Sequence, residues 1–160
     1  SYLWLRKPNK IAIKNLLEFF ESKNIESSRI VFAERVELYE EHLARYKFGD
    51  LLLDTFIYNG HTTTIESLWA GLPVITLEGN SFASRVSSSI LKSIGFEDLI
   101  AKTKDEYVEK VIFFSKNKEE LNKFRKRLFK LKSEHKLFNT KEFVRNFEQV
   151  LKKIKNDFKE

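Results

Sequence analysis

The sequence predicts an α/β fold, in which a Rossmann-like parallel sheet has flanking helices and is followed by a helical C-terminal tail. Short apolar runs alternate with segments of helical periodicity over about residues 1–102. From about residue 103 to residue 160 the periodicity is helical throughout. The chain has 160 residues, of which 42% are hydrophobic, and this suffices for a packed core. We therefore expect one domain, residues 1–160.

Each element has its own local signal. The expected strands are short and rich in β-branched, aromatic or leucine residues: 2–5, 29–32, 51–54 and 73–77. Apolar residues that recur three or four positions apart predict helices at 11–20, 39–48, 62–70, 84–94, 104–115, 118–132 and 140–158. Three of these helices end at a glycine that can act as a C-terminal cap: Gly49, Gly71 and Gly95. The residues expected to face the core from the 62–70 helix and its end are Ile65, Leu68, Trp69 and Leu72.

Composition excludes several classes of site. The chain has no cysteine, so disulfides, thiolate zinc sites and cysteine nucleophiles are excluded. No stretch approaches the roughly 20 apolar residues that span a bilayer, so we expect no membrane partner. We expect a cytoplasmic protein, because the absence of cysteine agrees with a reducing compartment. The first five residues are too short for a secretory signal and are typical of an internal strand, so we expect a piece of a longer protein.

The net charge of +6 raises the question of an anionic partner. Much of the excess lies in the last third of the chain, where acidic residues are interleaved with the basic ones. This pattern is typical of a solvated helix face, and no RNA-binding motif accompanies it. We expect no nucleic-acid partner, and binding through the C-terminal helices stays a minor alternative.

The most informative segment runs from Asp54 through Asn59 and Gly60 into the helix that begins near residue 62. Ligands of open parallel sheets bind at the carboxyl ends of the strands, which is where this segment lies. A helix N-terminus offers N–H groups without partners and a partial positive charge, and glycine lets the backbone approach a ligand. His61 and Thr62 add further donors, so the segment predicts a phosphate cradle.

Thr63 belongs to the same cradle, and Glu66 lies one turn after Thr62 on the same edge of the helix. A carboxylate at that place can accept two hydrogen bonds from ribose hydroxyls. The alternative is purely structural: Thr62 or Thr63 caps the helix, and Glu66 closes a capping box.

Two further clusters follow other strands. His42 and Arg45 are three residues apart and share a helical face, with a surface histidine and an ion-paired arginine as the alternative. Ser84 can cap the helix that follows it, and Arg85 can reach a phosphate. No Asp-x-Asp pair follows a strand, and no histidine and carboxylate cluster has metal-ligand spacing, so we expect neither a metal nor a cofactor.

Several segments, in this order and spacing, resemble the C-terminal catalytic lobe of the O-linked N-acetylglucosamine transferases, and the plant-type protein O-fucosyltransferases are similar too. The likeness covers nearly the whole chain and is most specific in Asn-Gly-His-Thr-Thr followed by Trp-Ala-Gly-x-Pro. The segments that carry it are Arg29–Phe32, Glu40–His42, Leu53–Thr55, Asn59–Thr63, Leu68–Pro73, Ala83–Val86, Leu99–Lys102 and Leu137–Lys141.

The resemblance implies the donor-binding lobe of a B-type protein glycosyltransferase that is independent of metal and inverts the sugar carbon. The donor would be UDP-N-acetylglucosamine. The resemblance implies a diphosphate-binding role for His61, Thr62 and Thr63. Glu66 takes the place of an acidic ribose ligand that is usually aspartate. The residues expected near the nucleotide are His42 and Arg45.

The sequence also departs from the family's pattern. Tyr39 stands where relatives often carry a lysine that contacts the nucleotide. The family's loop with a phosphate-binding lysine, its acceptor lobe and its peptide-binding repeats lie upstream and are not in this chain. We therefore assign no catalytic residue, and we expect the protein acceptor to bind through the upstream regions and the chain to be inactive without that lobe. The open alternatives are a GDP-fucose or UDP-glucose donor and a non-catalytic interaction domain.

The resemblance bears on the sheet as well. The family's first strand of this lobe also lies upstream of residue 1. We therefore expect the strand at 2–5 to pair directly with the strand at 51–54, or the fragment to dimerise through the exposed edges.

Overall fold

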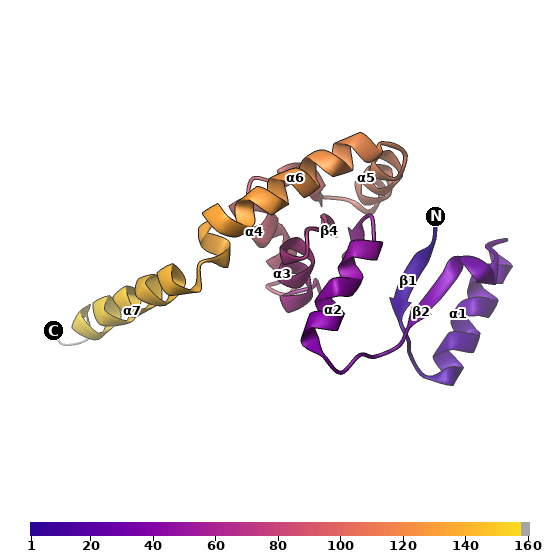
Figure 1. The fold of residues 1–160 in the computed structure, drawn as a ribbon, viewed down its shortest axis with the longest axis horizontal. Coiled ribbons are helices and arrows are strands. Elements are labelled where there is room, and N and C mark those ends of the chain that lie inside the picture. Colours follow the sequence, from indigo (N-terminus) through magenta and orange to yellow (C-terminus); the bar gives the residue numbers. More distant parts are fainter. Residues whose placement is uncertain (158–160) are drawn as a thin grey trace. The chain divides into compact units, whose positions relative to one another are not determined.

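The structure, a computed structural model, describes residues 1–157 (Figure 1). The chain divides into two compact units, Ser1–Gly49 and Asp50–Glu160, and each is described by itself. Both contain parallel strands joined by helices, which confirms the predicted α/β class with parallel strands.

The first unit is a parallel strand pair with its crossover helix (Figure 1). The register runs from Leu3 opposite Ile30 to Arg6 opposite Ala33. The expected direct pairing of this first strand with the strand near residue 52 is wrong, because its partner in the sheet is the strand at Ile30–Ala33. The elements of this unit are β1 (Leu3–Arg6), α1 (Lys10–Ser22), a 3₁₀ turn (Ser27–Arg29), β2 (Ile30–Ala33), α2 (Tyr39–Arg45) and a 3₁₀ turn (Tyr46–Phe48).

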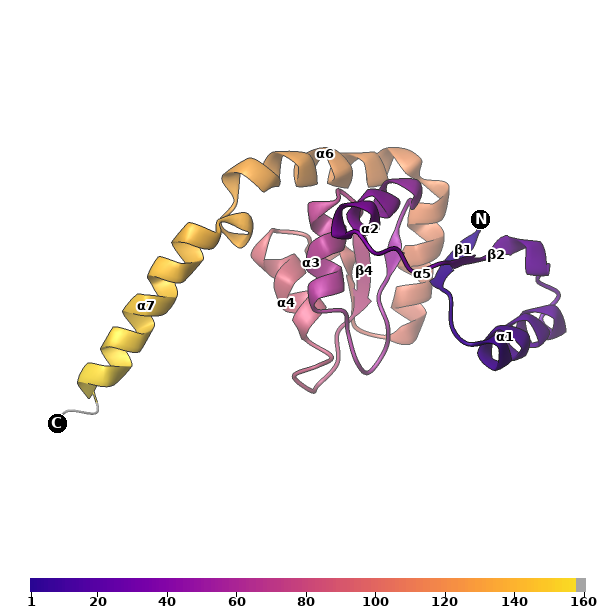
Figure 2. The same ribbon diagram turned by 60° about the horizontal axis from the view of Figure 1, so that its bottom comes forward.

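The second unit holds a three-stranded parallel sheet in the order β3-β4-β5. Helices α3 and α4 lie on one side of the central strand β4, and α5 lies on the other (Figure 2). A helical C-terminal tail follows, as expected. The elements are β3 (Leu52–Leu53), α3 (Thr62–Trp69), β4 (Val74–Leu77), α4 (Val86–Ser93), β5 (Ile100–Ala101), α5 (Lys104–Lys116), α6 (Lys118–Glu134) and α7 (Thr140–Asp157), with 3₁₀ turns at Glu97–Leu99 and Lys136–Phe138.

The core of the second unit surrounds β4. Val74, Ile75 and Thr76 have no exposed surface, and neither has Phe96, whose ring packs edge-on against Phe124 with centroids 5.0 Å apart. Truncation of a buried phenylalanine to alanine costs about 3–5 kcal/mol, so this packing is a large part of the unit's stability. The carboxyl end of β4 is therefore held by a rigid core.

Several boundaries differ from expectation. Gly71 and Gly95 do end α3 and α4 with the left-handed φ angles of +85° and +70° that favour glycine. Gly49, at φ −84°, is not such a cap, because α2 passes into a 3₁₀ turn before it. The expected core residue Trp69 is 42% exposed and packs edge-on against Phe138. The two-residue strand β5 is too short to give a periodic signal, and Phe158 of the last predicted helix lies outside the described residues.

Candidate functional site

The loop between β3 and α3, residues 54–61, is closed on itself by a buried carboxylate. Asp54 follows β3 and is only 6% exposed. Its Oδ1 accepts hydrogen bonds from the backbone N–H of Thr55, at 2.9 Å, and of Gly60, at 2.7 Å. Its Oδ2 accepts from the hydroxyl of Thr76 on β4, at 2.6 Å. The start of the loop is thereby tied both to its end and to the central strand.

Gly60 is packed too closely for any other residue. Its carbonyl oxygen accepts from the hydroxyls of Thr64, at 2.9 Å, and Ser87, at 2.8 Å. A Cβ atom on Gly60 would lie 2.6 Å from Oγ1 of Thr63 and 2.7 Å from Oγ1 of Thr64. Glycine is therefore needed here for space, and the backbone of the loop lies directly on the first turn of α3.

The first turn of α3 points its N–H groups out of the helix. His61 is the N-terminal cap, and its side chain makes no cap hydrogen bond. Thr62 and Thr63 are exposed residues of the first turn, where N–H groups have no partner within the helix. The alternative interpretation, in which Thr62 or Thr63 is the cap and Glu66 closes a capping box, is therefore wrong. Glu66 lies one turn further along and is half-buried.

His61 lies between two exposed aromatic rings. Its imidazole stacks on Tyr58, with ring centroids 5.0 Å apart and an interplanar angle of 16°. Phe82 meets it edge-on at 6.1 Å. The Nε2 atom of His61 is buried and makes no hydrogen bond to the described residues. The ring is thus held in place, and its buried Nε2 is left without a hydrogen-bond partner among the described residues.

Asn59 joins this loop to the loop after β4. Its side chain has no exposed surface and donates to the carbonyl of Thr55 at 3.1 Å. Its backbone N–H donates to the carbonyl of Ala83 at 3.0 Å. Its Oδ1 is buried and, like Nε2 of His61, has no partner within the described residues. Buried polar atoms are nearly always paired, so two such atoms in one loop indicate a place that a ligand or water completes.

The loop after β4 has a structural role that differs from the expected one. Ser84 does not cap α4, since Arg85 is the residue at that position and makes no side-chain cap bond. The Ser84 hydroxyl instead donates to the carbonyl of Ser81 at 3.1 Å, and its backbone carbonyl accepts from Gly79 N–H at 2.9 Å. Arg85 is exposed. The structure thus assigns Ser84 to loop closure.

A second carboxylate, which the sequence did not single out, follows β4. Glu78 forms ion pairs with Lys92 and Lys102, and it accepts from the hydroxyl of Ser88 at 3.0 Å. The carboxylates of Asp54 and Glu78, which follow β3 and β4, are therefore both engaged by donors of the protein.

His42 and Arg45 lie in the first unit, on α2. The His42 ring meets the ring of Tyr46 edge-on at 5.4 Å. The guanidinium of Arg45 donates to the backbone carbonyl of Glu34. The structure therefore brings together Asn59, Gly60, His61, Thr62, Thr63 and Glu66, and places His42 and Arg45 in a different unit.

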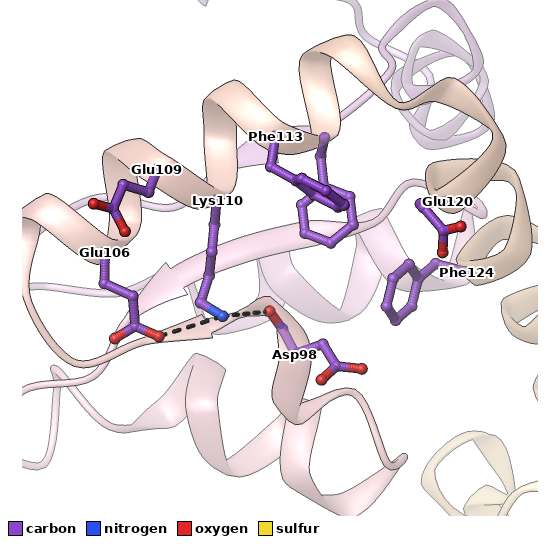
Figure 3. A pocket seen from close by; sticks show the side chains of 8 residues that line it. Asp98, Glu106, Glu109, Lys110, Phe113, Glu120 and Phe124 are labelled. Atoms are coloured by element: carbon purple, nitrogen blue, oxygen red, sulfur yellow. Dashed lines mark hydrogen bonds and ion pairs between the residues drawn. The ribbon is translucent and has the colours of Figure 1, made fainter.

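A hollow of the second unit lies elsewhere, between α5, α6 and the turn before β5 (Figure 3). It has a volume of about 440 Å³. Lys110 is the single ammonium group of its lining, and it is bonded to the Asp98 carbonyl and to Glu106. With four carboxylates around it, this hollow repels a diphosphate, so it is not the predicted anion site. The four are Asp98, Glu106, Glu109 and Glu120.

Residues 1–157 contain neither a candidate metal site nor a candidate membrane span. No group of three or more histidine, aspartate and glutamate side chains there is placed to hold a metal ion. No helix in the same range is both long enough and apolar enough to cross a membrane.

Comparison with known proteins identifies a family and several relatives. The family model for glycosyl transferase family 41 matches residues 1–147. A UDP-N-acetylglucosamine–peptide N-acetylglucosaminyltransferase of Caenorhabditis elegans is 33% identical over 151 residues, which are 94% of this chain and 13% of that protein. A probable UDP-N-acetylglucosamine–peptide N-acetylglucosaminyltransferase SPINDLY of Solanum lycopersicum is 35% identical over 141 residues, 88% of this chain and 15% of the relative.

A solved structure is similar as well. A mutant O-GlcNAc transferase of Thermobaculum terrenum superposes with a TM-score of 0.81 at 28% sequence identity, over 91% of this chain and 28% of the other. The family model covers far more than half of the chain, and the chain corresponds to a small part of each relative. On this ground the chain belongs to glycosyl transferase family 41.

Proposed function

We propose that this chain is the donor-binding lobe of a metal-independent, inverting protein O-glycosyltransferase that uses UDP-N-acetylglucosamine. The closed loop at Gly60, which leads into the open first turn of α3, carries the proposal. The names of the two relatives, both UDP-N-acetylglucosamine–peptide transferases, support the choice of donor and of a protein acceptor.

The chemistry of the transfer needs such a turn. When the bond between the sugar and the phosphate breaks, negative charge develops on the leaving diphosphate. Oriented N–H groups and the partial positive charge of a helix N-terminus stabilise that charge where it develops. The hydroxyls of the exposed residues Thr62 and Thr63 would add donors at the same place, and so would the unpartnered Nε2 of His61 when it carries a proton. These groups would do part of the work that a metal ion does in other transferases.

Two departures from the family's pattern, at Tyr39 and Glu66, keep a different nucleotide-sugar donor as the alternative. Tyr39 is 56% exposed and stands where family members often have lysine. Glu66 stands where they usually have aspartate, and it is one carbon longer. Both positions belong to the expected nucleotide contacts, so a different base or sugar, as in GDP-fucose or UDP-glucose, is the alternative.

Calorimetric titration of the full-length protein that carries this chain, with UDP, GDP and ADP in the presence of a chelator, tests the proposal. We expect UDP to bind most tightly and the chelator to leave its affinity unchanged. Stronger binding of GDP would transfer support to the fucosyl alternative. Equal or absent responses to all three nucleotides would contradict a live donor site.

A matched pair of variants locates the site. Thr62→Ala removes an exposed hydroxyl from the first position of α3, and Thr140→Ala removes one from the first position of α7. Only the first should weaken UDP binding. A lost hydrogen bond to a charged group is worth about 1.5–3 kcal/mol, which is roughly a tenfold to hundredfold change in Kd.

A further inference from the structure

We propose that Asp54 is the positioning residue of this donor site: its carboxylate fixes the Gly60 amide, and with it the first turn of α3, in the arrangement that receives the diphosphate. The inference rests on the proposed function, because the diphosphate is the ligand of the groups that Asp54 would position. Asp54 itself touches no ligand in this scheme.

The carboxylate joins the two ends of the loop to a strand that is distant in sequence. Oδ1 receives the N–H groups at both ends of the loop, those of Thr55 and Gly60, and Oδ2 receives the hydroxyl of Thr76, which is 22 residues away on β4. Thr76 has no exposed surface and belongs to the rigid central strand. Through Asp54, the position of Gly60 is thereby fixed relative to the core of the unit.

The backbone of Asp54 is fixed as well. Its N–H donates to the carbonyl of Ile75 in the sheet, at 3.0 Å. Its carbonyl accepts from the buried hydroxyl of Tyr107 on α5, at 3.0 Å, and the Tyr107 ring packs edge-on against Phe56 at 4.8 Å. A residue held by its main chain on two sides can hold other groups in place by its side chain.

Because Asp54 is buried, we infer that it acts on the ligand indirectly, through the Gly60 amide. At 6% exposure, and with both oxygens already bonded to the protein, the carboxylate has little surface to offer a sugar or a base. A negative charge also repels a diphosphate, so direct contact would oppose binding. Hydrogen bonds to a carboxylate are about twice as strong as those between neutral groups, and this suits the group for holding an amide in place.

Four variants of the full-length protein test the inference, with hydrogen exchange of the Gly60 amide and the kinetics of sugar transfer as the two measurements. Asp54→Ala removes both acceptors and should speed Gly60 exchange by at least about tenfold. Asp54→Asn keeps one oxygen for the two N–H groups and should restore most of the protection. Thr76→Val frees Oδ2 alone and should give an intermediate rate. Asp50→Asn is the control: it removes an exposed carboxylate just before β3, the strand that Asp54 follows, and it should change neither Gly60 exchange nor the kinetics.

The kinetics separate positioning from general stability. The cradle binds the diphosphate of the donor and stabilises the charge that develops on it, so loss of its order should both raise KM for the donor and lower kcat, whereas a merely smaller folded fraction would lower kcat and leave KM unchanged. Unchanged Gly60 exchange in Asp54→Ala would overturn the proposal, and so would faster exchange with an unchanged KM. If Asp54→Ala does not fold, Thr76→Val decides, and wild-type exchange and KM in that variant would overturn it.

The same measurements distinguish the two proposals. Faster Gly60 exchange in Asp54→Ala, in a protein whose wild type binds no nucleotide, would confirm the hold on the loop and refute the donor site. Tight UDP binding by the wild type, with unchanged Gly60 exchange and KM in every Asp54 variant, would support the donor site and refute the positioning role of Asp54.

Discussion

Replacement of Gly60 by alanine tests the packing of the loop most directly. The new Cβ would lie 2.6 Å from Oγ1 of Thr63 and 2.7 Å from Oγ1 of Thr64, about 0.8 Å and 0.7 Å short of the 3.4 Å at which ordinary contacts begin. Thr63 is exposed and can turn away. Thr64 is buried, and its hydroxyl is bonded to the carbonyl of Gly60 and lies 2.7 Å from that of Ser87, so it cannot. The backbone of the loop must therefore move.

Such overpacking destabilises a protein by about 1–3 kcal/mol. Displacement of a positioning group by about 1 Å can also cost on the order of 10²-fold in rate. We expect Gly60→Ala to lower the melting temperature, to weaken UDP binding in calorimetry and to slow transfer. Gly71→Ala is the matched control, because Gly71 has φ +85° but no heavy atom within 4 Å of its Cβ position. It should cost about 1 kcal/mol through backbone strain alone and leave UDP affinity unchanged. Equal effects of the two variants on UDP affinity would refute the steric argument.

Three other substitutions have definite expected outcomes. His61→Ala should reduce transfer on the order of 10²-fold, as the loss of one donor to the developing charge does, with little change in melting temperature; a large fall in melting temperature with normal turnover would make His61 structural. Burial, and secondly the charge of Asp54, raises the pKa of Tyr107 above its usual 10.0. The folded state therefore keeps a proton that the unfolded state loses above about pH 10, and stability falls as the pH rises. In urea unfolding, Tyr107→Phe should be about 1 kcal/mol less stable than the wild type at neutral pH, and the difference should narrow above about pH 10. A hydrogen bond from the Lys102 amide, assisted by Lys110 and opposed by desolvation, lowers the pKa of Glu106 below 4.5. The ionised Glu106 carboxylate therefore stabilises the folded state above about pH 4.5, and this stabilisation is lost as the pH falls through the lowered pKa of the folded state. When the pH is lowered from about 6 to about 3, the melting temperature of Glu106→Gln should therefore fall less steeply than that of the wild type.

The sequence was most informative where the signal is local. The alternation of apolar runs and helical periodicity predicted the bounds of β4 within one residue. The signal is clear because both faces of this strand are buried, as the fully buried neighbours Val74 and Ile75 show. Gly71 and Gly95 were recognised as helix ends because a left-handed residue after a helix is most often glycine, although Asn24 takes that place after α1. The loop motif with Gly60 was found from a different local signal, a glycine between a strand and a helix, where the backbone can approach a ligand closely.

What the sequence did not reveal depends on partners that are distant in the chain. The role of Asp54 requires Thr76, and the support of the Gly60 carbonyl requires Ser87, 27 residues away. A polar residue directly after a leucine run was the one signal that pointed to Asp54. Ser84 has the residue type of a helix cap but bonds within its own loop, and Glu78 acquires its role only when Lys102 is brought beside it.

The two hydroxyls beneath Gly60 also limit how this loop can evolve. Thr64 and Ser87 are 23 residues apart, their oxygens are 2.7 Å from each other, and both donate to one carbonyl. Alanine at either position would leave a gap and remove a hydrogen bond, and a larger side chain would enter space that does not admit even a methyl group on Gly60. In a library that randomises positions 60, 64 and 87 under selection for donor binding, glycine and two small hydroxyl residues should therefore return as a set. The residues at positions 60 and 64 would then change only together with position 87 on helix α4, although these positions are far apart in the chain.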